Sequence, residues 1–170
     1  MQASGFHRAA AARSFLVEEP VMPMDDETRV KMHIYETLAR TAAAPTVQST
    51  AQALDLDAGA VAEAFASLNR RRLLVPEPGD PSRIRMAPPF SGVSTQHVVT
   101  TAERSYFANC AWDTFGIAAA LHQDAEIRST CMDCGEALSL RIQDQRPRPD
   151  PVLFHIAVPA ARWWADIIYT

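Results

Sequence analysis

The chain has 170 residues, of which 48% are hydrophobic and 21% charged, with a formal net charge of −4. This length accommodates one medium domain or two small ones, and the acidic balance excludes the basic surface of a general nucleic-acid binder. No run approaches the roughly 18 apolar residues that a membrane helix needs, so we expect no membrane partner. The N-terminus lacks the apolar core of a secretory signal, which favours a cytoplasmic location.

Residues 1–24 are predicted to be a flexible tail, and residues 25–90 to be a small helical domain. Within it, "DDETRVKMHIYETLAR", "APTVQSTAQALDL" and "DAGAVAEAFASLNRRRLLV" have the cap residues and the apolar spacing of helices. "LLVPEPGDPSRIRMA" then has two apolar runs around a Pro/Gly/Asp turn, as a hairpin has. Three helices followed by a two-stranded wing indicate a winged helix-turn-helix.

DNA binding is the obvious interpretation of such a domain, because its third helix would enter the major groove. The exposed face of that helix, however, offers Glu63, Ser67 and Asn69 before one basic cluster, Arg70–Arg72. A basic cluster at a helix C-terminus commonly complements the helix dipole. We therefore favour a scaffold or lid role and do not expect DNA as a partner.

Residues 91–170 are predicted to form a second domain with a helix and a mixed or antiparallel sheet, giving an α+β fold overall. An apolar helix is expected from about Ser105. Strands "EIRST" and "ALSLRI" flank the turn "CMDCGE", and after the loop "QRPRPDP" a further strand is expected at "VLFHIAV".

The three cysteines, Cys110, Cys131 and Cys134, all lie in this second half. An odd number without an export signal favours reduced thiols over a disulfide framework. Cys131 and Cys134 form a C-x-x-C pair, which is half of a zinc site, but His122 and His155 are isolated and no second pair exists. A thioredoxin-type redox pair is also disfavoured, because no helix opens at Cys131.

Cys110 and Asp113 are three positions apart, so on a helix they would share a face. One interpretation is a buried structural cysteine beside a solvent-facing aspartate. The other is a working pair of a thiol and a carboxyl group. Burial near Trp112 and Phe115 would raise the pKa of that carboxyl group and favour its holding a proton.

The segments "YFANCAWDTFGI", "DAEIRSTCMDCGEALSL" and "FHIAVPAARWWADIIYT" resemble the organomercurial (alkylmercury) lyases. The resemblance covers most of residues 104–170, and the first half is similar to the small N-terminal domain of that family. It implies that Cys110 is the first mercury ligand and Asp113 the proton carrier in protonolysis of a carbon–mercury bond. It implies no cofactor, and as partners an organomercurial substrate and small thiols. A mercuric reductase is a further candidate partner, and whether it receives the product stays open.

The family pattern has a second catalytic cysteine downstream of a segment like "VLFHIAV", whereas no cysteine follows Cys134 here. Three explanations stay open. One is a truncated chain, in which Trp163 and Trp164 would be exposed at an interface with the missing part. Another is a stop codon that is a recoded selenocysteine, and the third is that Cys131 or Cys134 serves as the substitute mercury ligand. Two other functions also stay open, a winged-helix regulator that binds a soft metal and an inactive lyase remnant.

Overall fold

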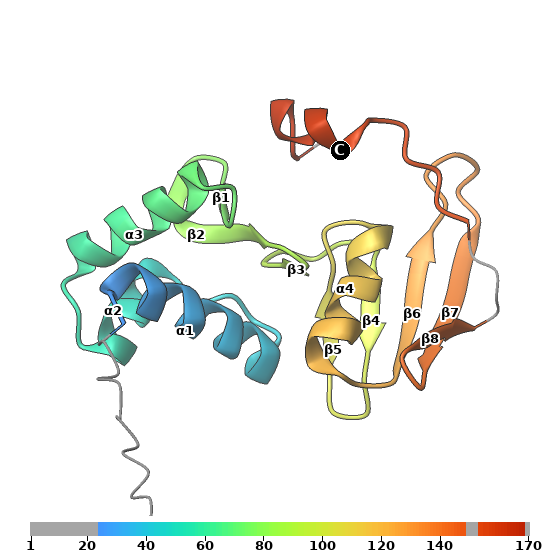
Figure 1. The fold of residues 1–170 in the computed structure, drawn as a ribbon, viewed down its shortest axis with the longest axis horizontal. Coiled ribbons are helices and arrows are strands. Elements are labelled where there is room, and N and C mark those ends of the chain that lie inside the picture. Colours follow the sequence, from blue (N-terminus) through green and yellow to red (C-terminus); the bar gives the residue numbers. More distant parts are fainter. Residues whose placement is uncertain (1–23, 149–152, 169–170) are drawn as a thin grey trace, which may run out of the picture.

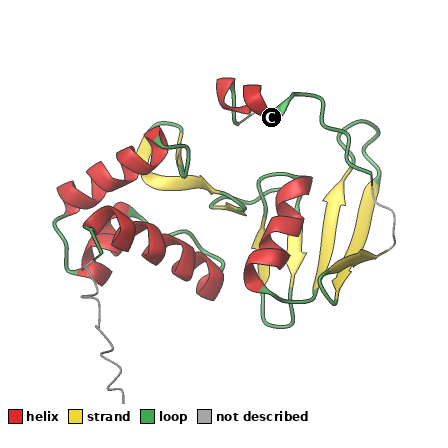
Figure 2. Cartoon of the chain, in the orientation of Figure 1, coloured by secondary structure: helices red, strands yellow, loops and turns green. Residues whose placement is uncertain are grey.

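The computed structural model describes residues 24–148 and 153–168, so the tail expected over residues 1–24 lies outside the described part except for Met24. The first half contains three helices and a small sheet, and the second half contains a larger sheet and one helix (Figures 1 and 2). The helices are α1 (Asp26–Thr41), α2 (Val47–Leu54), α3 (Ala58–Arg70) and α4 (Ala111–Leu121), with a short 3₁₀ helix η1 at Ala160–Ala165. The strands are β1 (Val75–Glu77), β2 (Asp80–Ala87), β3 (Phe90–Ser91), β4 (Val98–Thr100), β5 (Ser105–Phe107), β6 (Ala125–Thr130), β7 (Ala137–Gln143) and β8 (Arg146–Arg148).

Each of the first three helices begins at a side chain that accepts a hydrogen bond from its first turn. Asp25 caps α1 through the N–H of Thr28, and Asp57 caps α3 through the N–H of Ala60. Thr46 and Ser49 form a reciprocal capping box at α2. These bonds satisfy N–H groups that have no partner inside the helix. The helices therefore start close to where the sequence predicts.

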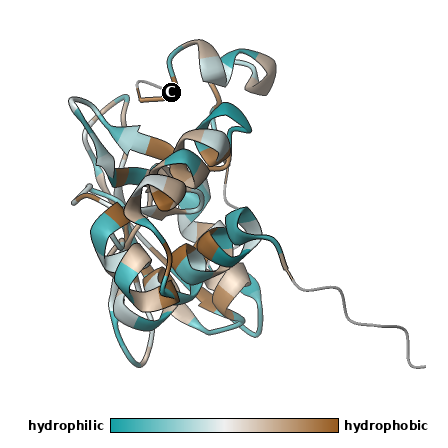
Figure 3. Cartoon of the chain, turned by 90° about the vertical axis from the view of Figure 1, so that its left-hand side faces the viewer, coloured by the Kyte–Doolittle hydropathy of each residue, from teal (hydrophilic) through white to brown (hydrophobic). Residues whose placement is uncertain are grey.

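The inward face of α1 is also the one predicted from spacing, since Val30, Ile34 and Leu38 are all buried. Figure 3 shows hydrophobic and hydrophilic residues mixed along the helical ribbons, as amphipathic helices require. Strands β1 and β2 pair antiparallel as the predicted hairpin, and β3 extends them to a three-stranded sheet. Classification of this half as a winged helix stays a prediction.

The second half is built on a five-stranded sheet in the order β5-β4-β6-β7-β8, with every pairing antiparallel. Helix α4 contacts β4 and β6, the central strands of this sheet. The hairpin predicted around "CMDCGE" is present as β6 and β7. The α+β fold class is thus confirmed, and the sheet is antiparallel rather than mixed.

The predicted start of the apolar helix at Ser105 was wrong. Residues 105–107 form strand β5, in which Ser105 is exposed and Tyr106 buried, and the helix begins only at Ala111. This alternation is the pattern of a half-buried strand. The later start of the helix matters, because it places Cys110 at the junction between strand and helix rather than inside a helix.

The strand predicted at "VLFHIAV" was also wrong for its described residues, 153–158, which have no strand structure. The place beside β7 is taken by β8, from the segment predicted to be a loop. Asp144 and Gln145 connect β7 to β8 with φ of 51° and 58°, the left-handed conformation that a tight hairpin turn needs. The β7–β8 hairpin therefore fills this edge of the sheet.

The two halves share one continuous hydrophobic core, which runs from Val30 in α1 to Ile142 in β7. Tyr106 joins them directly, because its ring packs on Phe90 with centroids 5.7 Å apart and its hydroxyl donates to the carbonyl of Ala39, 2.7 Å away. The division into domains at residue 90 stays a prediction, but the hydrophobic interiors of the halves are not separate. In the part of the chain that the structure describes, no helix is long and apolar enough to cross a membrane.

We predict that Tyr106→Phe lowers the free energy of unfolding by about 1–2 kcal/mol, because it leaves a carbonyl in the last turn of α1 without its donor. Urea denaturation followed by circular dichroism measures this. The control is Ser105→Ala, which removes an exposed hydroxyl hydrogen bond in the same strand and should change stability by less than about 0.5 kcal/mol. Equal effects of the two substitutions would contradict this account of how the halves are joined.

Candidate active site

Cys110 lies at the N-cap position of α4, where the chain leaves β5 and turns into the helix. It is a free, half-buried thiol. Burial raises the pKa of Cys110, and the negative charge of Asp113 raises it further. The N–H groups of Asp113 and Trp112 act in the opposite direction and favour the thiolate. The thiol is therefore mostly protonated while Asp113 is charged.

Asp113 lies in the first turn of α4 and is half-buried rather than facing solvent. Burial raises the pKa of its carboxyl group, whereas hydrogen bonding with Asn109 and Cys110 lowers it. The Nδ2 atom of Asn109 donates to Oδ2 of Asp113 at 3.0 Å. The structure thus brings the two predicted catalytic residues together, and the interpretation with a solvent-facing aspartate does not hold.

Asn109 is a site residue that sequence reasoning missed. Besides its bond to Asp113, its Nδ2 donates to the carbonyl of Pro89 at 3.3 Å, while its Oδ1 is buried without a hydrogen-bond partner. Asn109 therefore ties the Asp113 carboxylate to the segment that joins the two halves. Its spacing of four residues from Asp113 is the sequence signal that could have found it.

Tyr35 brings the first half of the chain to the site. Its hydroxyl donates to the carbonyls of Pro88 at 3.1 Å and Leu73 at 3.4 Å. Burial raises the pKa of this phenol, and the charge of Asp113 raises it to a smaller extent. Nothing in the sequence indicated this neighbour, because α1 precedes Asp113 by more than seventy residues.

The start of the segment 153–168 packs against α4 through Phe154. The ring of Phe154 meets those of Trp112 and Phe115 edge-on, with centroids 5.5 Å and 5.1 Å apart. Farther along, Trp163 donates its Nε1–H to the carbonyl of Val158. The prediction that Trp163 and Trp164 are exposed was wrong, since both are half-buried; the exposed tryptophan is Trp112, at 56%.

The other two predicted mercury ligands, Cys131 and Cys134, lie in the turn between β6 and β7. Hydrogen bonding from the N–H groups of Cys134 and Asp133, and from the Cys134 side chain, lowers the pKa of Cys131. Within residues 24–148 and 153–168, no group of three or more His, Cys, Asp or Glu side chains could hold a metal ion. A four-ligand zinc site is therefore absent from this described part.

The basic cluster at the end of α3 is largely occupied by contacts within the chain. Arg70 pairs with Glu63 at 2.8 Å, and Arg71 pairs with Glu27 of α1. The guanidinium of Arg72 stacks over the ring of Trp164, 5.7 Å from its centroid. These contacts favour the structural role expected for the cluster over contact with DNA phosphates.

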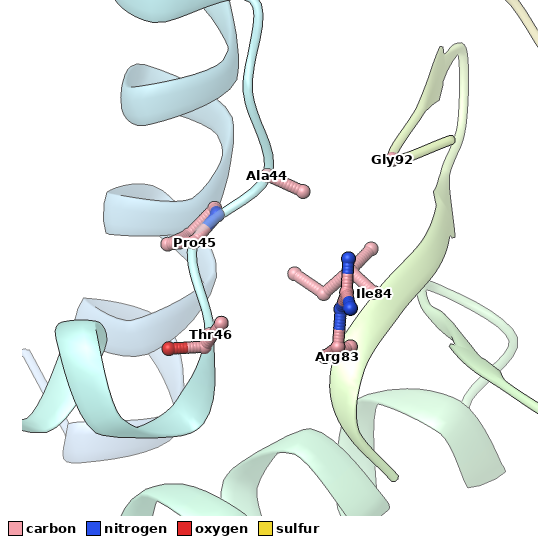
Figure 4. A pocket seen from close by; sticks show the side chains of 6 residues that line it. All are labelled: Ala44, Pro45, Thr46, Arg83, Ile84 and Gly92. Atoms are coloured by element: carbon pink, nitrogen blue, oxygen red, sulfur yellow. The ribbon is translucent and has the colours of Figure 1, made fainter. Parts of the chain in front are cut away.

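One pocket of about 220 Å³ lies between the α1–α2 connection and strand β2 (Figure 4). It is lined by Ala44, Pro45, Thr46, Arg83, Ile84 and Gly92. The lining contains neither a thiol nor a carboxylate, and it belongs to the first half of the chain. We therefore place the chemistry at the start of α4 and not in this hollow.

A family model described as alkylmercury lyase matches residues 90–170, the part of the chain that contains Cys110, Asp113, Cys131 and Cys134. The second half of this chain matches the alkylmercury lyase family. The expected resemblance is thus confirmed over these residues.

The fold is similar to that in the crystal structure of the mercury-bound form of MerB2, with a TM-score of 0.59 and 23% sequence identity. The match covers 75% of this chain and 62% of that chain, so this protein spans less than two thirds of the length of MerB2. At this identity the likeness shows the fold. No curated protein matches the chain.

We predict that Asp113→Asn shifts the alkylation of Cys110 by iodoacetamide to lower pH. The carboxylate raises the pKa of the thiol, so its removal lowers that pKa and the thiolate forms earlier as pH rises. Peptide-resolved mass spectrometry of reaction rate against pH separates Cys110 from the other cysteines. Cys131 serves as the internal control and should keep its profile; an unshifted Cys110 profile would show that the carboxylate does not act on the thiol.

Proposed function

We propose that this chain is an organomercurial lyase that cleaves carbon–mercury bonds by protonolysis, giving a hydrocarbon and Hg(II). The observation that carries this proposal is the placement of Cys110 at the N-cap of α4 and of Asp113, held by Asn109, in the first turn of the same helix. The reaction needs a soft ligand for mercury and a proton for the departing carbon. A thiolate is the soft ligand, and a carboxylic acid held in a protein interior is a proton donor.

The first step is the binding of mercury by Cys110. The thiol proton passes to the Asp113 carboxylate, and the thiolate displaces the outgoing ligand from mercury. The two ionisations are linked: protonation of Asp113 removes the negative charge that disfavours the Cys110 thiolate. The N–H groups at the start of α4 then stabilise the sulfur's negative charge.

The second step is the transfer of the proton from Asp113 to carbon. The electron pair of the carbon–mercury bond becomes the new carbon–hydrogen bond, and mercury remains as Hg(II) on sulfur. Burial supports this role, because it raises the pKa of Asp113 and keeps its proton available for transfer. Asn109 holds the carboxylate in place, and the Phe154 ring beside Trp112 and Phe115 provides an apolar surface for the organic group.

A second thiolate on mercury would push electron density toward carbon and ease its protonation. In this proposal a small thiol of the medium supplies it, and the same class of molecule carries Hg(II) away. A mercuric reductase in the cytoplasm is the class of enzyme that would consume the product, since it reduces Hg(II). Protection against organic mercury compounds would be the consequence for the cell.

The test is hydrocarbon release from phenylmercury in excess small thiol, measured by gas chromatography. We predict that Cys110→Ser abolishes release and that Asp113→Asn lowers its rate by about 10²- to 10⁴-fold, the usual contribution of a positioned acid. Asp26→Asn is the matched control, because this exposed carboxylate at the start of α1 pairs with Arg29 on the surface, away from α4. Its rate should equal that of the unaltered chain.

Benzene formation by the Cys110→Ser variant at the unaltered rate would overturn the proposal, and so would a lack of benzene from the unaltered chain. Circular dichroism of each variant shows whether it is folded, so that a loss of activity reports on chemistry.

A further inference from the structure

The turn between β6 and β7 places two thiols side by side on a hydrogen-bonded scaffold. The N–H of Cys131 donates to the carbonyl of Glu136 at 2.8 Å, and the N–H of Gly135 donates to the carbonyl of Cys131 at 2.9 Å. Gly135 has a φ of +75°, which a residue with a side chain rarely adopts. The pairing of Thr130 with Ala137 closes the turn at its base.

Cys131 and Cys134 lie three positions apart in the short turn that joins β6 to β7. The N–H groups of Cys134 and Asp133, and the Cys134 side chain, favour negative charge on the Cys131 sulfur and lower the pKa of that thiol. The turn therefore holds both thiols within one short loop that backbone hydrogen bonds close.

The turn is also accessible and sulfur-rich. Cys134 is exposed and Cys131 half-buried, and both are free thiols. Met132 between them is 81% exposed, and its sulfur accepts a hydrogen bond from Nε2 of Gln96 at 2.7 Å. This contact fixes the turn against the connection that precedes β4.

The ligand count decides the class of ion. Zinc in a structural site takes four ligands, and the described residues offer no cluster of even three. Hg(II) is satisfied by two thiolates, and soft sulfur ligands select soft ions over hard ones. We propose that Cys131 and Cys134 form a second mercury site, which chelates Hg(II) through both sulfurs without help from Cys110.

The Cys131–Cys134 turn lies at the same end of the sheet as Cys110. Only three residues connect the end of α4 to the start of β6, so the helix and the strand run in opposite directions. Consequently the start of α4 and the end of β6 lie at the same end of the sheet (Figure 1). The Cys131–Cys134 turn is thus on the same side of the molecule as the proposed lyase site, but the binding of Hg(II) there does not depend on lyase activity.

The test uses the reduced full-length chain, inorganic Hg(II) alone as the probe, and native mass spectrometry during titration with glutathione. The Cys110→Ser variant isolates the turn and should bind one Hg(II) per chain. Removing that ion should require at least about a hundredfold more glutathione than in Cys110→Ser/Cys134→Ser, because the second thiol of a chelate acts at a high effective concentration. Cys110→Ser/Cys131→Ser should behave like the Cys134 double variant.

Equal sensitivity of the Cys110→Ser variant and the two double variants to glutathione would overturn the proposal, as would Hg(II) that bridges two chains. Cys134 is exposed, so its replacement by serine leaves the fold intact, which circular dichroism verifies. Because the readout is the binding of Hg(II), its outcome is separate from that of the hydrocarbon-release test.

Discussion

The packing of α4 against the Pro88–Pro89 segment is the contact on which the rest of the site depends. Gly116 allows it, because a Cβ atom at that position would come within 2.9 Å of the Pro89 ring. Asn109 secures it with one amide group that donates both to the Pro89 carbonyl and to Asp113. The same close approach therefore joins the two halves and sets the orientation of the carboxylate.

Burial is the second consequence of this packing. At the start of a solvent-exposed helix, a carboxyl group and a thiol would have ordinary pKa values, and the charge of one would have little effect on the ionisation of the other. Here the Phe154 ring covers Trp112 and Phe115 on α4, and Cys110 and Asp113 are both half-buried. Low solvation raises the pKa of both groups, because burial disfavours their charged forms. This is the electrostatic basis of the proposed protonolysis.

The second half of the chain then presents two kinds of thiol. Cys110 is half-buried beside a carboxylate that opposes its ionisation. Cys131 lies on a turn whose N–H groups favour ionisation, with a second thiol next to it. A buried thiol paired with an acid suits a reaction that moves protons, whereas an exposed pair suits the binding of a metal ion. We infer that proton transfer at Cys110 and metal binding at Cys131 and Cys134 take place at separate positions near the same end of the sheet.

The sequence by itself determined the local features of this protein: the three capped helices of the first half, the β6–β7 hairpin and the C-x-x-C turn. These depend on residues within a few positions of one another, so spacing and cap chemistry suffice to predict them. Only the tertiary structure decided that Ser105–Phe107 is a strand and that β8, from a segment predicted to be a loop, pairs with β7 at the sheet edge. It also decided that Tyr35 and the carbonyl of Pro89 surround the site, because contacts between residues far apart in the chain depend on how the sheet and the helices pack, which no local pattern records.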